Sequence, residues 1–187
     1  MCHYITASLP GNVNVDSMAA IFKSHKLGFE LISNPHVSEH LEAGDLYVLT
    51  TRGHCDCGTA LGSLDVSAPS DGPGYERELK KFRKQGWSEA KINRWLEQKE
   101  QTKEKHQRED EARARGSTHE LNQWVELITD VLKSGDARRL GLLLHLYHGG
   151  LESERINILR REKVKLTETT QELLIGIQED VLYEFVV

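Results

Sequence analysis

The sequence predicts an α/β protein of the α+β type: a mixed, largely antiparallel sheet with helices on one side and an inserted, charged helical hairpin. Three observations predict this fold. The first third of the chain contains short segments of β-type alternation, the middle is helical and rich in charge, and the end returns to β-type alternation. Strands and helices segregated in this way are typical of α+β domains. A length of 187 residues suits one domain with an insertion.

The first predicted strand covers residues 3–9 and ends at Pro10. Because side chains alternate along a strand, its two faces carry different residues. One face carries His3, Ile5, Ala7 and Leu9. The opposite face carries Cys2, Tyr4, Thr6 and Ser8.

Capping residues and β-rich runs predict the next elements. Asn14 or Asp16 caps a short helix that ends by Gly28. Residues 29–32 and 46–51 are predicted strands.

Residues 58–64 are a weaker predicted strand, because two glycines interrupt them. We expect this segment to pair with residues 46–51 as a hairpin whose turn carries residues 53–57.

The middle of the chain is predicted to be helical. Residues 67–74 are a predicted flexible linker, because Ser, Pro and Gly dominate them. Residues 75–135 are a predicted helical hairpin, inserted into the sheet domain. Its section 97–115 carries six acidic and six basic side chains, and so no net charge, which is typical of a solvated helix. We expect Gly116 to end this section and residues 117–120 to cap the apolar helix that follows.

The C-terminal part completes the sheet. Alternating apolar residues predict strands at 140–147, 156–166 and 180–187, with a short helix capped by residues 169–172. The sheet domain is therefore predicted to consist of residues 1–66 and 136–187.

Composition narrows the class of protein. The 24 basic and 29 acidic side chains give a net charge of −5, which argues against nucleic acid as a partner. No apolar run approaches the length of a membrane-spanning helix. Three cysteines are an odd number, which favours free or metal-bound thiols in a reducing, cytoplasmic environment. The helical hairpin is the segment expected to bind a protein partner or to support self-association.

All three cysteines, with two of the nine histidines, lie at the N-terminus and in one later loop. Thiolates spaced two residues apart can reach one Zn²⁺, and imidazoles or further thiolates complete such a site. The predicted ligands are Cys2, His3, His54, Cys55 and Cys57. These residues predict a regulatory or interaction module that binds zinc or responds to redox state.

A thiol–imidazole pair is another arrangement that these residues allow. Cys55 lies next to His54 and near Arg52, while His145 and His148 are distant in sequence. Sequence neighbours on a strand point to opposite faces, so His54 reaches Cys55 only if the turn reorients it. We expect an ordinary surface histidine here.

A second hypothesis starts from Cys2, which follows Met1 directly. Met-Cys at the head of a strand, a Thr-Arg pair at residues 51–52 and a His-Gly-Gly turn at 148–150 resemble N-terminal-nucleophile hydrolases of the glutamine-amidotransferase type. The string at residues 35–40 also resembles one found in some of these domains. This resemblance implies an amidohydrolase in which Cys2 is the nucleophile, Arg52 binds substrate, and His148 and Gly149 form the oxyanion turn. His3 stands where that family has glycine, and Gly149 stands where it has asparagine.

Overall fold

A computed structural model describes residues 1–62 and 76–187, without the side chains of 76–77 and 103–115. The predicted linker at 67–74 lies outside the described residues. The chain divides into two compact units, Met1–Leu64 with Ser117–Val187, and Asp65–Gly116. The first unit holds the sheet and the second a pair of helices.

The first unit is built on a six-stranded mixed sheet, which confirms the predicted α+β fold. Its strands are β1 (Cys2–Leu9), β2 (Glu30–Ile32), β3 (Leu46–Leu49), β4 (Arg139–Tyr147), β5 (Arg160–Lys165) and β6 (Val181–Val186). They lie in the order β2-β3-β1-β4-β6-β5, and every neighbouring pair is antiparallel except β5 with β6. Strand β1 is therefore central, between β3 and β4.

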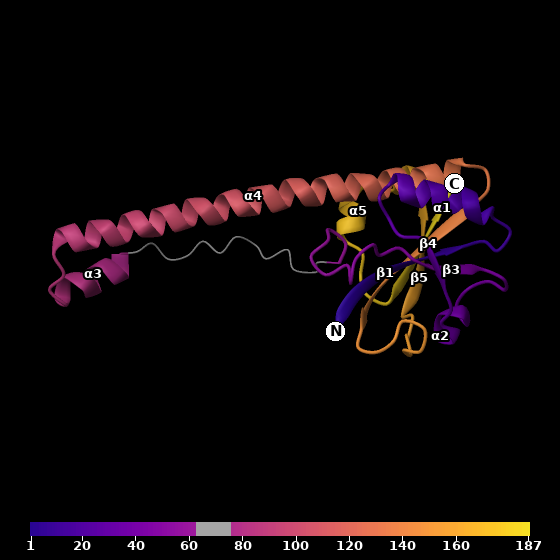
Figure 1. The fold of residues 1–187 in the computed structure, drawn as a ribbon, viewed down its shortest axis with the longest axis horizontal. Coiled ribbons are helices and arrows are strands. Elements are labelled where there is room, and N and C mark those ends of the chain that lie inside the picture. Colours follow the sequence, from indigo (N-terminus) through magenta and orange to yellow (C-terminus); the bar gives the residue numbers. More distant parts are fainter. Residues whose placement is uncertain (63–75) are drawn as a thin grey trace. The chain divides into compact units, whose positions relative to one another are not determined.

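One face of the sheet is covered by α1 (Val15–Ser24), by the C-terminal turns of α4 (Glu89–Lys133) and by α5 (Gln171–Ile175) (Figure 1). The predicted alternation of β1 holds, since Ile5, Ala7 and Leu9 are buried on this face. Burying apolar stripes from helices against one face of a sheet is the main stabilising contribution in folds of this kind.

The opposite face is covered by the single-turn helix α2 (Pro35–Ser38) and by the loop before β5. Asn34 begins α2, because its side chain accepts the N–H groups of His36 and Val37. Its amide group also donates to the carbonyls of Leu151 and Glu154, which ties this helix to the loop. The hydroxyl groups of Thr6, Tyr47 and Tyr147 are mixed with apolar side chains on this face.

The second unit contains α3 (Glu76–Lys84) and the N-terminal part of α4. Phe82 stacks on Trp87 with ring centroids 4.3 Å apart, and Trp95 contacts Phe82 edge-on at 4.9 Å. Ile92 is fully buried. The three aromatic rings form a small cluster within this unit.

Helix α4 runs without interruption through Gly116, so the predicted helix end and capping box at this point are wrong. One glycine inside a helix costs only about 1 kcal/mol. The strong apolar stripe beyond it is buried in the first unit, with Leu121, Trp124, Leu127, Ile128 and Val131 in the core. Packing of that stripe outweighs the local stop signal.

No helix in the described part of the chain is long and apolar enough to span a membrane. The N-terminal section of α4 is long but strongly charged.

Candidate functional site

The candidate site lies at the Cys2 end of β1, where the regular pairing with β3 stops. The ladder between these strands ends at Thr6 and Leu49, and Thr50 then donates to the carbonyl of Ile5 through both its N–H and its hydroxyl. Beyond Thr50 the chain leaves the strand and forms the loop 51–62. We call this segment the thiol loop, because it contains Cys55 and Cys57.

Asp56 returns the thiol loop to β1. Its N–H donates to the carbonyl of His3 at 2.8 Å, and its carboxylate accepts the N–H of Ile5 at 2.7 Å. The Thr51 hydroxyl donates to the same carboxylate oxygen at 2.5 Å. Asp56 therefore replaces the missing strand partner of β1, and it holds its two flanking cysteines beside the strand.

Turns, not a strand, follow Cys57. The predicted strand at 58–64 is wrong over residues 58–62, which form turns, and residues 63–64 lie outside the described range. Gly58 has a φ of +89°, which favours glycine, and a Cβ on Gly62 would lie 2.0 Å from the Asp56 carbonyl oxygen. The Thr59 N–H and hydroxyl both donate to that same carbonyl. The glycines thus permit a tight loop around Asp56 and not a second hairpin strand.

The fold brings the three cysteines together. The sulfur atoms of Cys2, Cys55 and Cys57 all lie within 4.8 Å of one another, and the cysteines are free of disulfides. Thiolates bound to one tetrahedral zinc ion at about 2.3 Å lie roughly 3.8 Å apart. Small side-chain movements therefore suffice for all three sulfurs to bind one ion. Among the described residues, this is the group of His, Cys, Asp and Glu side chains placed to share a metal.

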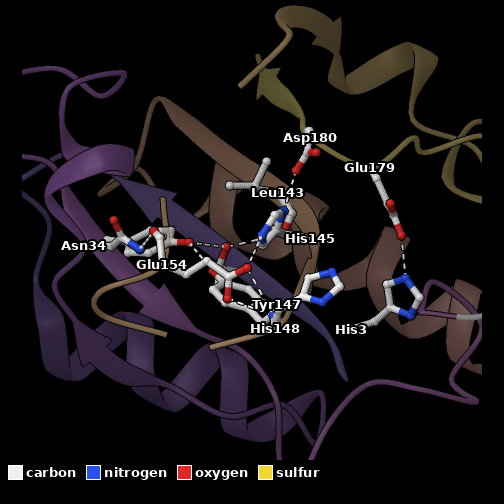
Figure 2. A network of polar contacts seen from close by, with 11 residues as sticks. His3, Asn34, Leu143, His145, Tyr147, His148, Glu154, Glu179 and Asp180 are labelled. Carbon is white, nitrogen blue, oxygen red and sulfur yellow. Dashed lines mark hydrogen bonds and ion pairs between the residues drawn. The ribbon is translucent and has the colours of Figure 1, made fainter. Parts of the chain in front are cut away.

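His3 and His54 lie beside this cysteine cluster but outside the group of atoms close enough to share an ion. The His3 N–H donates to the Cys57 sulfur at 3.2 Å, and its ring Nδ1 lies 4.0 Å from that sulfur. His3 Nε2 pairs with Glu179 at 2.5 Å (Figure 2). His54 is exposed, and its carbonyl accepts the Tyr4 hydroxyl at 2.6 Å.

Several acidic groups surround the thiol loop. Burial, and then the neighbouring Cys2, Cys55, Asp56 and Cys57, raise the pKa of Tyr4. Burial raises the pKa of Asp56, against the hydrogen bonds from Thr51 and Ile5 that lower it. Bringing thiolates together in such surroundings is unfavourable unless a cation compensates their charge.

The residues of the amidohydrolase hypothesis are arranged differently. Cys2 is paired with Tyr147 across β1 and β4, so it lies close to the turn at 148–150. However, the N–H groups of His148 and Gly149 both donate to the Glu154 carboxylate, at 2.8 and 2.6 Å. These bonds, against an opposing effect of burial, hold the pKa of Glu154 below its ordinary value. The turn amides thus bind a carboxylate of the same chain.

Arg52 is exposed at the start of the thiol loop. Catalysis by Cys2 remains a prediction, and the turn occupied by Glu154 offers it no oxyanion donor.

Sequence reasoning missed a polar network beside the cluster (Figure 2). His145 Nδ1 pairs with Asp180 at 2.5 Å, and its buried Nε2 lies 3.6 Å from Glu154 without a hydrogen bond. Tyr147 contacts the His145 ring edge-on, and its hydroxyl lies 3.2 Å from that of Tyr47. Alternation along β4 is the signal that was available, because it places His145 and Tyr147 on the face that carries Cys2 and Tyr4.

No protein family model, curated protein or solved structure matches this chain. Function therefore has to be inferred from the cysteine cluster itself. The arrangement of the three sulfurs is one that can hold a metal ion.

Proposed function

We propose that this protein is a zinc-binding regulatory module whose ion is held by Cys2, Cys55 and Cys57. The observation that carries the proposal is that three sulfurs from two distant segments lie within 4.8 Å of one another. Thiolate ligands select soft or borderline ions, and zinc is the common choice for such sites.

The surroundings of the sulfurs support this proposal. Asp56 fixes the middle of the Cys55–Cys57 segment on β1 through two hydrogen bonds, one to the His3 carbonyl and one from the Ile5 N–H. The His3 N–H donates to the Cys57 sulfur, which favours a thiolate. A site prepared in this way loses less entropy on binding than a flexible loop does.

A fourth ligand completes the tetrahedral set. His54 is exposed and next to Cys55, and its side chain would have to turn toward the sulfurs to reach the ion. We propose the His54 imidazole for this position. With an ion bound, the thiol loop and the start of β1 are linked by metal bonds. Zinc would then control whether this end of the sheet presents one fixed surface to a partner.

Metal titration tests the proposal. Purified full-length protein, reduced and stripped with a chelator, is titrated with Co²⁺ and then with Zn²⁺. We expect one equivalent of Co²⁺ to bind with thiolate-to-metal charge-transfer absorption, and zinc to displace it. The single variants Cys2→Ser, Cys55→Ser and Cys57→Ser should each weaken zinc by more than about 100-fold, more than loss of a supporting hydrogen bond does.

Two histidine variants make the test sharper. His54→Ala should weaken zinc and shift the Co²⁺ spectrum, whereas His36→Ala, which changes a partly buried histidine on α2, is the matched control and should do neither. Absence of charge-transfer absorption in the wild-type protein, or loss of binding in only one cysteine variant, contradicts the shared site.

A further inference from the structure

We propose that Cys57 of the metal-free protein is the attacking thiol of a thiol–disulfide exchange site, with Cys2 as the resolving thiol. His3 and Glu179 prepare Cys57 for attack, and the substrate class is a low-molecular-weight disulfide. This inference deepens the proposed function, because it uses the same sulfurs, but it does not require that zinc binds.

Access distinguishes Cys57 from the other two thiols. Cys57 is exposed, whereas Cys2 and Cys55 are partly buried. An attacking sulfur has to approach a disulfide along its S–S axis, so it needs open space in front of it. A resolving sulfur attacks a bond already formed inside the site and needs only to be close. The exposed Cys57 suits the first role, and the more buried Cys2 suits the second.

The contacts around Cys57 match those of an activated nucleophile. Its sulfur accepts the His3 N–H at 3.2 Å and lies 4.0 Å from the His3 Nδ1. On the other side of the ring, Nε2 is 2.5 Å from a Glu179 carboxylate oxygen. With Nε2–H donating to Glu179, Nδ1 is the proton acceptor that faces the sulfur. A nucleophile, a base and a group that orients the base therefore lie in line, and such contacts are often loose before substrate binds.

The three residues come from three separate parts of the chain. His3 lies on β1, Cys57 in the thiol loop, and Glu179 in the turn between α5 and β6. Asp180, the next residue, has a φ of +60° and donates its N–H to the Leu144 carbonyl on β4. The Asp180 carboxylate pairs with His145 (Figure 2). These contacts fix the turn between α5 and β6, and the fixed turn places Glu179 beside His3.

The chemistry balances in two steps. The Cys57 thiol gives its proton to His3, and its sulfur attacks one sulfur of the substrate, forming a mixed disulfide and releasing the first substrate thiolate. That thiolate takes the proton from His3. Cys2 then attacks the Cys57 sulfur, which forms a Cys2–Cys57 disulfide and releases the second substrate thiol with the proton of Cys2. The protein loses two electrons, and the substrate disulfide gains them.

Asp56 explains the choice of Cys2 over Cys55 as the resolving thiol. Cys55 and Cys57 flank Asp56, whose N–H and carboxylate are both held on β1. A disulfide between them would close a very small ring around this fixed residue, and disulfides tolerate little departure from their preferred geometry. Cys2 belongs to a different segment, and its sulfur lies within 4.8 Å of that of Cys57.

Reaction with oxidised glutathione tests the inference on reduced, full-length protein in chelator at one fixed pH. In wild-type protein, peptide mapping after brief exposure to limiting iodoacetamide should find Cys57 alkylated at least about tenfold faster than Cys2 or Cys55. Oxidised glutathione should yield two equivalents of reduced glutathione and a Cys2–Cys57 disulfide. Cys2→Ser should stop at a glutathione adduct on Cys57, whereas Cys55→Ser should react like the wild type.

Variants of His3 and Glu179 separate an effect on the reaction rate from an effect on the fold. His3→Gln should lower the rate of the first step about tenfold, and Glu179→Gln should lower it less. Glu179→Asp should restore part of that rate, and neither Glu179 variant should change the thermal midpoint. Equal alkylation of all three thiols, or resolution by Cys55, overturns the inference.

The same samples distinguish this failure from failure of the proposed function. Fast Cys57 chemistry without zinc binding supports this inference and contradicts the zinc site, and zinc binding with equally reactive thiols gives the opposite result.

Discussion

The two ends of strand β1 are closed in different ways. At the Leu9 end, Asp45 precedes β3 and Arg139 begins β4, so an ion pair joins the neighbours of β1. Both carboxylate oxygens of Asp45 accept from the Arg139 guanidinium, at 2.9 and 2.8 Å, and Glu42 adds a contact at 2.7 Å. At the Cys2 end, three sulfurs face one another, and the Cys57 sulfur accepts one backbone N–H at 3.2 Å.

The Leu9 end is held together by contacts within the chain, whereas the Cys2 end is the one that we propose to be functional. The hydrogen bonds that Arg139 donates to Asp45 raise the pKa of Arg139 against an opposing effect of burial, and the Asp45 side chain is only 3% exposed. Charges at this end compensate one another within the chain. Thiolates at the Cys2 end would repel one another, and Tyr4 and Asp56 add no cation. A positive ligand, or loss of thiol through oxidation, would relieve this repulsion, as the proposed zinc binding and thiol exchange would do.

The largest expected effect on the free energy of unfolding comes from a substitution at the Leu9 end of β1. Asp45→Ala leaves Arg139 with only the exposed Glu42, and we expect it to lower the free energy of unfolding by about 3 kcal/mol. Zinc affinity should stay unchanged in the folded variant, because the two ends are separate. Urea denaturation measures the first quantity and Co²⁺ competition the second. Glu42→Ala, which removes an exposed partner, is the control and should cost at most about 1 kcal/mol. A parallel loss of zinc affinity in Asp45→Ala would remove the distinction between the ends.

Asp56 should show a smaller effect on stability and a larger one on the site. Asp56→Ala leaves the buried N–H of Ile5 without its acceptor, which costs about 2 kcal/mol. It also frees the cysteine-bearing loop, so zinc affinity should fall by about 10- to 100-fold. Asp56→Asn keeps an oxygen for the Ile5 N–H and should retain most of both. Thermal unfolding and zinc competition on the two variants measure the effects, and equal losses in both variants would show that hydrogen bonding by residue 56 is not what places the loop.

Glu154 tests how the turn beside Cys2 responds to acid. Its pKa in the folded protein lies below the ordinary value of about 4.3. The charged carboxylate therefore adds stability above that pH, and this contribution is lost as pH falls through the lower folded pKa. Glu154→Gln should be less stable than the wild type at pH 6 by at most about 1 kcal/mol, and the difference should shrink as the pH is lowered below about 4.3. Denaturation curves across this range measure it; a constant difference at every pH argues against the charge.

The smallest expected effect is that of Arg52. This side chain is exposed, and Arg52→Ala should change stability by less than about 0.5 kcal/mol and zinc affinity by less than about twofold. The amidohydrolase hypothesis gives Arg52 a substrate-binding role. Hydrolysis of a glutamine amide by the wild type that disappears in Arg52→Ala would revive that hypothesis.

Local patterns in the sequence were sufficient to predict much of the fold. The alternation of β1 correctly placed Ile5, Ala7 and Leu9 on one face, which the structure buries in the core, and Cys2 on the opposite face. Helix boundaries failed where tertiary packing opposed them, since the buried stripe after Gly116 continues α4 through the glycine. The hairpin at the cysteines failed because Gly58 and Gly62 serve a tight loop around Asp56.

The site was harder to predict, because its contacts join distant parts of the chain. Cysteine positions pointed to the cluster, but nothing local indicates that the Asp56 carboxylate takes the place of a strand. Glu179 is 176 residues away from its partner His3. Such pairs depend on strand order and register, which only the assembled sheet defines.

X-ray absorption spectroscopy at the zinc edge tests the shared site most directly. Full-length protein loaded with one equivalent of zinc should show three sulfur neighbours at about 2.3 Å and one lighter neighbour at about 2.0 to 2.1 Å. A zinc shell made only of nitrogen and oxygen, or with a single sulfur, would contradict the account that Cys2, Cys55 and Cys57 form one site.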